Sequence, residues 1–223
     1  HLLAFALVLD GSGSTLGASN RWIKAGAKVF AEKMQGSDQG SVFTYGSGTM
    51  MVQGMTSDSA DVKRASDSLI AVGASATYDA VYQALNHVGV AGSRSRRAII
   101  AVADSPDNAS GYSSADVVAL SQQLNIPVIM IGVGSGMNPT VFQSLTEMTG
   151  GKFYSAADSV QLSQAFRDAY EYIADSFEEC RLVYVSRCGD GAMHTVEVSA
   201  SNVCGGNDTD SKQFREAVDP LGH

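Results

Sequence analysis

Short runs of almost entirely apolar residues alternate along this chain with longer stretches whose apolar residues recur at helical spacing. The apolar runs cover residues 2–9, 98–103 and 127–131, and each is followed directly by Asp or Gly. Such runs are typical of parallel strands that are buried on both faces. The stretches with helical spacing are 22–34, 62–69, 81–88, 117–124 and 158–179. This alternation predicts an α/β fold with a doubly wound, mostly parallel sheet flanked by helices.

The pattern changes after residue 179. Residues 182–186 and 195–200 are rich in β-branched or aromatic residues, and Gly189-Asp190-Gly191 between them is a turn signal. We therefore expect an α/β domain over residues 1–179 and a small β-hairpin appendage over 180–204. Residues 205–223 are polar and are expected to form a loose tail.

Composition and charge narrow the classes of partner. Hydrophobic residues make up 44% of the 223 residues, which is enough to bury one sizeable core. The 23 acidic residues outnumber the 15 basic ones, and this balance has the wrong sign for holding nucleic acid or anionic lipid. The apolar runs are also much shorter than the roughly 20 residues of a spanning helix. We expect no nucleic-acid partner and no direct insertion into a membrane.

The first apolar run ends in Asp10-Gly11-Ser12-Gly13-Ser14. This motif places one carboxylate and two hydroxyls at the carboxyl end of a parallel strand, where open α/β sheets bind their ligands. The alternating spacing lets the three oxygen-bearing side chains converge on one point. Because carboxylate and hydroxyl oxygens are hard ligands, the motif favours Mg²⁺, Mn²⁺ or Ca²⁺ over thiophilic metals.

Two further loops offer oxygen ligands in the same manner. Residues 73–77 read Gly-Ala-Ser-Ala-Thr and open the helical stretch 81–88, while Asp104-Ser105 follows the apolar run 98–103. With these three loops in this order and spacing, residues 3–178 resemble the von Willebrand factor type A domain, also called the integrin I-domain fold.

The resemblance implies a metal-ion-dependent adhesion site. In that site, two motif serines and a hydroxyl of the second loop bind a divalent ion, and the carboxylates act mostly through water. The corresponding positions here are Asp10, Ser12, Ser14, Ser75 and Asp104. The family usually has a Gly-Gly-Thr-like second loop and Thr-Asp-Gly in the third, so both loops depart from the pattern. Thr77 competes with Ser75 for the role of the third hydroxyl, and the sequence leaves that choice open.

A metal held mainly by neutral hydroxyls keeps much of its positive charge and one open position, which a carboxylate of another molecule can fill. We therefore expect a non-enzymatic adhesion or protein-interaction module, with neighbouring domains in a longer parent chain, that binds a partner bearing an exposed acidic group. The alternative is a structural scaffold unit of a surface fibre or envelope complex, in which the metal only stabilises the domain. A nucleotide-binding enzyme is disfavoured, because Leu16 stands where the dinucleotide fingerprint needs its third glycine.

The cysteines bear on the cellular compartment. Cys180, Cys188 and Cys204 all lie in or beside the expected appendage, and a monomer can pair only two of them. A Cys180–Cys204 bridge would clamp the hairpin base, and the other two pairings stay open. A disulfide would indicate an exported protein. Since a type A domain with a trailing hairpin is also similar to bacterial exported proteins, we expect an extracellular, cell-surface or periplasmic location. A cytoplasmic domain with reduced thiols is the alternative.

Overall fold

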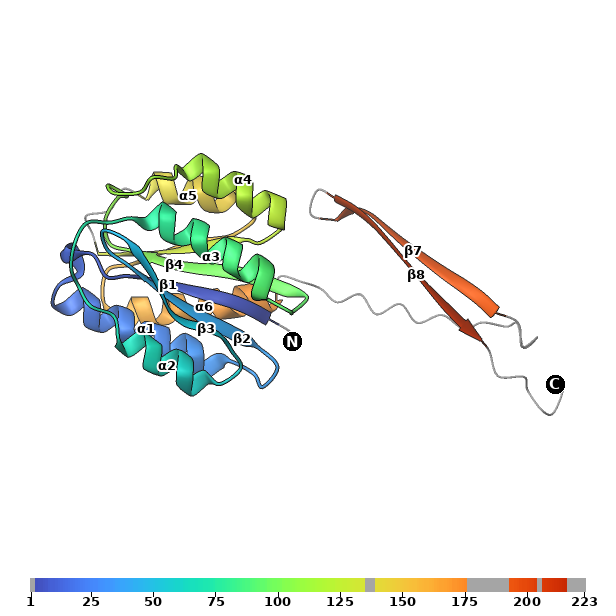
Figure 1. Ribbon diagram of the computed structural model, residues 1–223, viewed down its shortest axis with the longest axis horizontal. Helices are drawn as coiled ribbons and strands as arrows, with labels where there is room; N and C mark the ends of the chain where they lie inside the picture. Colours follow the sequence, from blue (N-terminus) through green and yellow to red (C-terminus); the bar gives the residue numbers. More distant parts are fainter. Residues whose placement is uncertain (1–2, 135–138, 176–192, 204–205, 216–223) are drawn as a thin grey trace. The chain divides into compact units, whose positions relative to one another are not determined.

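The computed structural model describes residues 3–134, 139–175, 193–203 and 206–215 (Figure 1). Contacts divide the chain into two compact units, His1–Glu178 and Glu179–His223. The first unit contains a six-stranded sheet in the order β3-β2-β1-β4-β5-β6, and all neighbouring strands are parallel except β2 and β3. These strands are β1 (Leu3–Asp10), β2 (Gln39–Tyr45), β3 (Thr49–Thr56), β4 (Arg96–Ala103), β5 (Val128–Val133) and β6 (Phe153–Ala156).

Helices cover both faces of this sheet. On one face lie α3, α4 and α5, and on the other lie α1, α2 and α6 (Figure 1). The helices are α1 (Ala18–Lys33), α2 (Ser59–Asp67), α3 (Thr77–Ala91), α4 (Ser114–Leu124), α5 (Thr140–Met148) and α6 (Ser159–Asp175). The predicted doubly wound α/β fold is therefore confirmed. The helix expected over 158–179 is α6, and residues 176–179 lie outside the described ranges.

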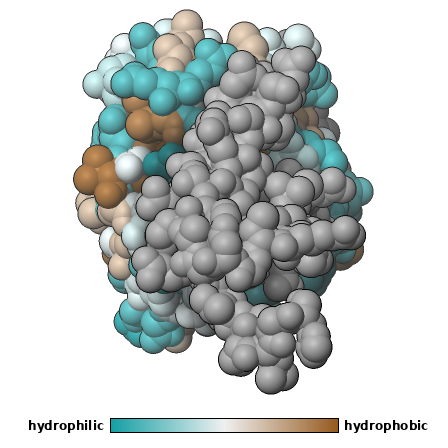
Figure 2. All heavy atoms as spheres, turned by 90° about the vertical axis from the view of Figure 1, so that its right-hand side faces the viewer, coloured by the Kyte–Doolittle hydropathy of each residue, from teal (hydrophilic) through white to brown (hydrophobic). Residues whose placement is uncertain are grey.

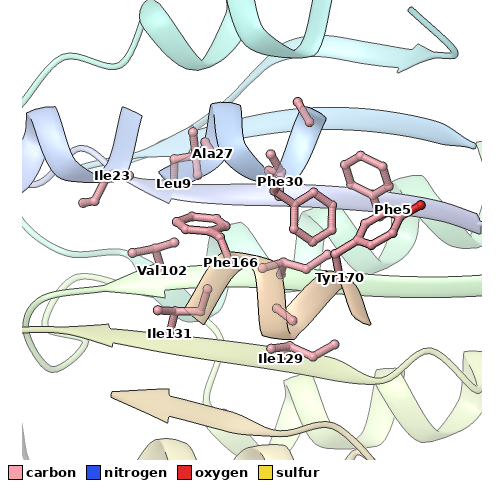
Figure 3. Close-up of a cluster of buried hydrophobic side chains, with 14 of the residues drawn as sticks. Phe5, Leu9, Ile23, Ala27, Phe30, Val102, Ile129, Ile131, Phe166 and Tyr170 are labelled. Carbon is pink, nitrogen blue, oxygen red and sulfur yellow. The ribbon is translucent and has the colours of Figure 1, made fainter. Parts of the chain in front are cut away.

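Each face of the sheet has its own apolar core. Every residue of β1 is buried, because this central strand is covered by helices on both sides. Toward α1 and α6, the ring of Phe30 packs edge-on against Phe5 and Tyr170, with centroids 4.9 and 5.4 Å away (Figure 3). Toward α3 and α4, Val8 and Ile99 pack against residues such as Val81 and Val117. These two cores fix the sheet between its helix layers.

The direction in which the chain winds reverses between β1 and β4. After β1 the chain moves outward to β2 and β3, and it then returns to place β4 on the other side of β1. Because β1 and β4 are parallel, their carboxyl ends lie side by side, with Asp10 ending β1 and Asp104 following β4. A sheet of this kind binds its ligands at such a switch point.

The second unit contains β7 (Met193–Val203), which pairs antiparallel with β8 (Gly206–Arg215). The expectation of a loose tail is wrong for residues 206–215, since they form the second strand of the hairpin. Residues 206–211 read Gly-Asn-Asp-Thr-Asp-Ser, and residues this polar become recognisable as a strand only through their pairing with β7. The predicted strand 182–186, the turn at 189–191 and all three cysteines lie outside the described residues.

On the face shown in Figure 2, hydrophilic residues dominate the coloured surface, and a group of hydrophobic residues lies at its left edge. None of the helices in the described part of the chain combines the length and the apolar character needed to cross a membrane.

Candidate metal centre

The loop after β1 is organised by a buried carboxylate. Asp10 is 0% exposed, and its Oδ1 accepts the backbone N–H of Ser12 at 2.8 Å. Its Oδ2 accepts the backbone N–H of Asp104 at 3.0 Å, so one side chain ties the first motif loop to the loop after β4. Burial raises the pKa of Asp10 above its ordinary value, and the nearby charge of Asp104 adds to this, while the hydrogen bonds from Ser12 and Asp104 oppose it.

A chain of side-chain oxygens continues from this loop. Ser14, on the short 3-10 helix η1 (Gly13–Thr15), has its Oγ 2.9 Å from the Oγ of Ser12. The Ser14 hydroxyl also donates to Oδ1 of Asp104 at 2.5 Å. The structure thus brings together four of the five predicted ligands, namely Asp10, Ser12, Ser14 and Asp104, and we call these four residues the oxygen cluster.

The fifth predicted ligand belongs to a hydroxyl pair beside the cluster. Ser75 is 1% exposed, and its Oγ lies 3.1 Å from Oγ1 of Thr77. Thr77 donates to the Tyr45 hydroxyl at 3.2 Å, and that hydroxyl donates to the carbonyl of Val102 at 2.7 Å. Among the described residues, neither Ser75 nor Thr77 hydrogen-bonds directly to the oxygen cluster.

Tyr45 at the end of β2 links the hydroxyl pair to Asp10. Burial raises the pKa of Tyr45 well above its ordinary value, and the negative charge of Asp10 raises it further. The phenol therefore stays protonated and holds Thr77 in place. No motif in the sequence points to a role for Tyr45. The available signal was its position at the end of a strand, and that signal is weak without the sheet order.

Hydrogen bonds to the backbone hold the three loops together. The N–H of Gly13 donates to the carbonyl of Gly73 at 2.8 Å, and Gly73 has a φ of +90°, a conformation that glycine adopts without strain. Asn108 clamps Ser75 from the third loop, because its Oδ1 accepts the Ser75 N–H at 2.8 Å and its own N–H donates to the Ser75 carbonyl at 3.0 Å. The role of Asn108 could not be predicted from the sequence, because it depends on a contact with a residue 33 positions away.

The chemistry of this donor set suits a hard divalent cation. The oxygen cluster contains two carboxylates, those of Asp10 and Asp104. Neither carboxylate takes part in an ion pair between described residues. In the same ranges, no group of three or more His, Cys, Asp or Glu side chains could hold a metal. The oxygen cluster itself offers two hydroxyls beside two carboxylates, and such oxygens suit Mg²⁺, Mn²⁺ or Ca²⁺.

Comparisons with a protein family and with solved structures agree with the resemblance found in the sequence. The sequence profile of the von Willebrand factor type A domain matches residues 5–168. Among solved structures, a von Willebrand factor type A protein from Catenulispora acidiphila superimposes with a TM-score of 0.67 at 19% identity, covering 76% of this chain and 42% of that one. The vWF domain of the type V pili tip protein Mfa5 from Porphyromonas gingivalis gives 0.66 at 12% identity, covering 82% and 98%.

A third similar structure is proximal thread matrix protein 1 from the mussel byssus, described with a zinc-occupied metal-ion-dependent adhesion site motif. It has a TM-score of 0.64 and 20% identity, and the match covers 76% of this chain and 45% of that one. The present chain thus spans less than half the length of the Catenulispora and mussel proteins. No curated protein matches its sequence.

Proposed function

The chain belongs to the von Willebrand factor type A family, and on this premise we propose that it is a metal-dependent adhesion or protein-interaction module. The family typically mediates metal-dependent protein interactions and is usually non-catalytic. The observation that carries the proposal is the oxygen cluster, in which a buried Asp10 meets Asp104 and two serine hydroxyls.

The proposed ligands are the five predicted residues. Ser12, Ser14 and Ser75 would supply hydroxyl oxygens, and Asp10 and Asp104 would supply negative charge. Ser75 is favoured over Thr77, because the Thr77 hydroxyl already donates its hydrogen to Tyr45 and so accepts a hydrogen bond from the Ser75 hydroxyl. This leaves the lone pairs of Ser75 available to a cation. The proposed ion is Mg²⁺, with Mn²⁺ or Ca²⁺ as the alternatives.

Binding of an acidic partner follows from the charge balance of this site. When bound, the ion would act as a Lewis acid that accepts an oxygen of an incoming carboxylate. The three hydroxyls that would contact the ion are neutral. Asp10, which is engaged by two backbone N–H groups, and Asp104 would act mostly through water, so the ion would keep much of its positive charge. The residues therefore favour attraction of a further carboxylate from a partner protein.

A surface location is part of this proposal. Two of the similar structures are pilus proteins, the Mfa5 tip protein and the PilB minor pilin from Streptococcus sanguinis. We infer an extracellular, cell-surface or periplasmic domain, which would be one part of a longer chain.

A scaffold role is the second candidate. Gly13 and Asn108 already join the loops by hydrogen bonds, and a bound ion would then only stabilise the loops in this arrangement. The two roles differ in what Ser12→Ala changes. In a scaffold, this substitution lowers stability and leaves partner binding intact, whereas in an adhesion module it abolishes partner binding.

Displacement of metal-bound water by a carboxylate tests the proposal without knowledge of the partner. The metal-stripped chain is loaded with Mn²⁺, and water-proton relaxation is followed while acetate is added, with acetamide as the uncharged control. We expect acetate, but not acetamide, to lower the relaxation enhancement, and Asp10→Ala to show no enhancement above free Mn²⁺. An enhancement that acetate leaves unchanged would contradict an open, carboxylate-accepting position.

A further inference from the structure

Three large aliphatic side chains are strongly exposed near the first motif loop. Leu16 is 77% exposed, Ile70 is 74% exposed and Val72 is 65% exposed. Single exposed apolar residues are common on protein surfaces and need no explanation. These three, however, come from two segments that contact the same loop.

Backbone contacts place all three residues beside the loop that carries Ser12 and Ser14. The N–H of Leu16 donates to the carbonyl of Gly13 at 3.2 Å, and the N–H of Val72 donates to the carbonyl of Gly11 at 2.7 Å. Ile70 is equally close, since a Cβ added to Gly11 would lie 2.6 Å from the Ile70 carbonyl oxygen. We call Leu16, Ile70 and Val72 the apolar rim.

We propose that the apolar rim binds an aliphatic or aromatic side chain that neighbours the acidic residue in the partner. The partner segment is thus a peptide stretch in which Asp or Glu stands next to a large apolar residue. This inference rests on the proposed function, because it assigns the acidic residue to the metal centre. It adds a specificity that the oxygen cluster alone does not provide.

The physical reason is that the two contacts reinforce each other. A carboxylate exposed to water gains little from a nearby cation, because solvent screens the charges. An apolar contact at the edge of the site excludes water and lowers the local dielectric, so the same carboxylate is held more strongly. The rim also gains by burying aliphatic surface. A protein segment carries a carboxylate and an apolar side chain on neighbouring residues, so it can occupy the metal centre and the apolar rim together.

Selection from a random peptide library displayed on phage tests this inference. The full chain is immobilised with Mg²⁺, and bound phage are eluted with EDTA. We expect the eluted peptides to share an Asp or Glu with an apolar residue one or two positions away. Synthetic versions of these peptides should bind the triple variant Leu16→Ser, Ile70→Ser, Val72→Ser on the order of 10- to 100-fold more weakly.

Two controls make the result specific. Val90 and Met148 are also exposed, but they belong to the opposite end of the sheet, since Gly92 lies near Ala4 at the start of β1 and Thr149 bonds Val128 at the start of β5. The double variant Val90→Ser, Met148→Ser should therefore bind the peptides like the unaltered chain. The triple variant should also keep its Mg²⁺ affinity, because the rim supplies no metal ligand.

The outcomes separate the two proposals. EDTA-eluted acidic peptides without apolar neighbours, or equal binding to the triple variant, would overturn the role of the apolar rim and leave the metal-dependent function standing. Eluted peptides that lack an acidic residue, or synthetic peptides whose binding to the chain persists in EDTA, would overturn both. A failure to select any peptide would also count against both.

Discussion

Asp10 shows how a single side chain shapes the site. A fully buried carboxylate is costly unless its charge is compensated, and here the compensation comes from two backbone N–H groups. These bonds only partly offset burial, since the pKa of Asp10 remains raised. A bound cation would remove the remaining penalty. On the proposed function the residue would thus be more favourable in a loaded site than in an empty one, and we infer that this is why an acid ends an otherwise apolar strand.

His87 permits a prediction about pH and stability. Its ring lies 5.6 Å from the ring of Phe43, and its Nε2 is buried without a hydrogen-bond partner among the described residues. Burial lowers the pKa of His87 below 6.5. The unfolded chain therefore binds a proton at His87 more readily than the folded chain does. The contribution of neutral His87 to the free energy of unfolding is fully present above pH 6.5, and it is lost as the pH falls through the lower pKa of the folded chain.

The test compares the unaltered chain with His87→Phe in urea denaturation, both with EDTA, between about pH 7 and pH 5. We expect the free energy of unfolding to fall more steeply with acidification in the unaltered chain. Parallel pH dependence in the two proteins would show that His87 stays neutral or is equally accessible in both states.

At this scale the sequence predicts which oxygen-bearing side chains lie together better than it predicts the residues that support them. Asp10, Ser12, Ser14 and Asp104 were singled out by their positions at strand ends, and hydrogen bonds bring these four together. Tyr45 and Asn108 were missed. Their contacts with Thr77 and Ser75 depend on the packing of distant loops, and no local pattern in the sequence encodes this packing.

At the scale of elements, the second and third loops behave as one unit. Besides the clamp on Ser75, the carboxylate of Asp107 accepts the N–H of Tyr78 at 2.9 Å, and that of Asp79 accepts the N–H of Tyr112 at 2.8 Å. The start of α3 and the loop after β4 therefore hold each other in place. We infer that the positions of Ser75 and Asp104 are set jointly.

Substitution of Asn108 tests this coupling. Asn108→Ala removes the acceptor for the Ser75 N–H, so we expect the Mg²⁺ affinity to fall by about tenfold, as for the loss of one hydrogen bond. Asn108→Asp keeps an acceptor at the same place and should restore most of the affinity. The measurement is a metal titration of each variant. Unchanged affinity in Asn108→Ala would show that Ser75 is positioned without the clamp, or is not a ligand.

The contact between α1 and α6 gives a second prediction for an element. A Cβ added to Gly26 would lie 2.3 Å from Cδ2 of Phe166, whose side chain is fully buried. Gly26→Ala should therefore destabilise the chain by about 1–3 kcal/mol through overpacking. Gly36→Ala, where nothing lies within 4 Å, is the matched control and should change stability by less than about 0.5 kcal/mol. Equal stability of the two variants, measured in urea, would refute tight packing here.

The elements also show where sequence patterns stop being informative. Strands β1, β4 and β5 were predicted because burial on both faces makes them almost entirely apolar. The predictions omitted β2, β3 and β6. β2 contains a buried Ser41 whose hydroxyl bonds to the Phe5 carbonyl, β3 is a partly exposed edge strand, and β6 has only four residues. Strands that are polar or short can be recognised only from their pairing with neighbouring strands in the sheet.

For the whole molecule, the division into two units makes a prediction about truncation. Both apolar cores lie within His1–Glu178. A chain ending at residue 178 should therefore unfold cooperatively, with a melting temperature within a few degrees of that of the full chain, and should bind Mg²⁺ equally well. Calorimetry on both chains would check this. A large loss of stability or of Mg²⁺ affinity would mean that residues 179–223 support the first unit.

The most direct test of the proposed function is calorimetric titration of the metal-stripped full chain with Mg²⁺ and Mn²⁺. Asp10→Ala and Ser12→Ala are compared with the unaltered chain, and the folding of each protein is verified by circular dichroism. Saturable binding that disappears in both variants, while Val90→Ser binds normally, is the predicted result. Absence of binding to the folded, unaltered chain, or binding that survives both substitutions, would contradict a metal centre at the end of β1.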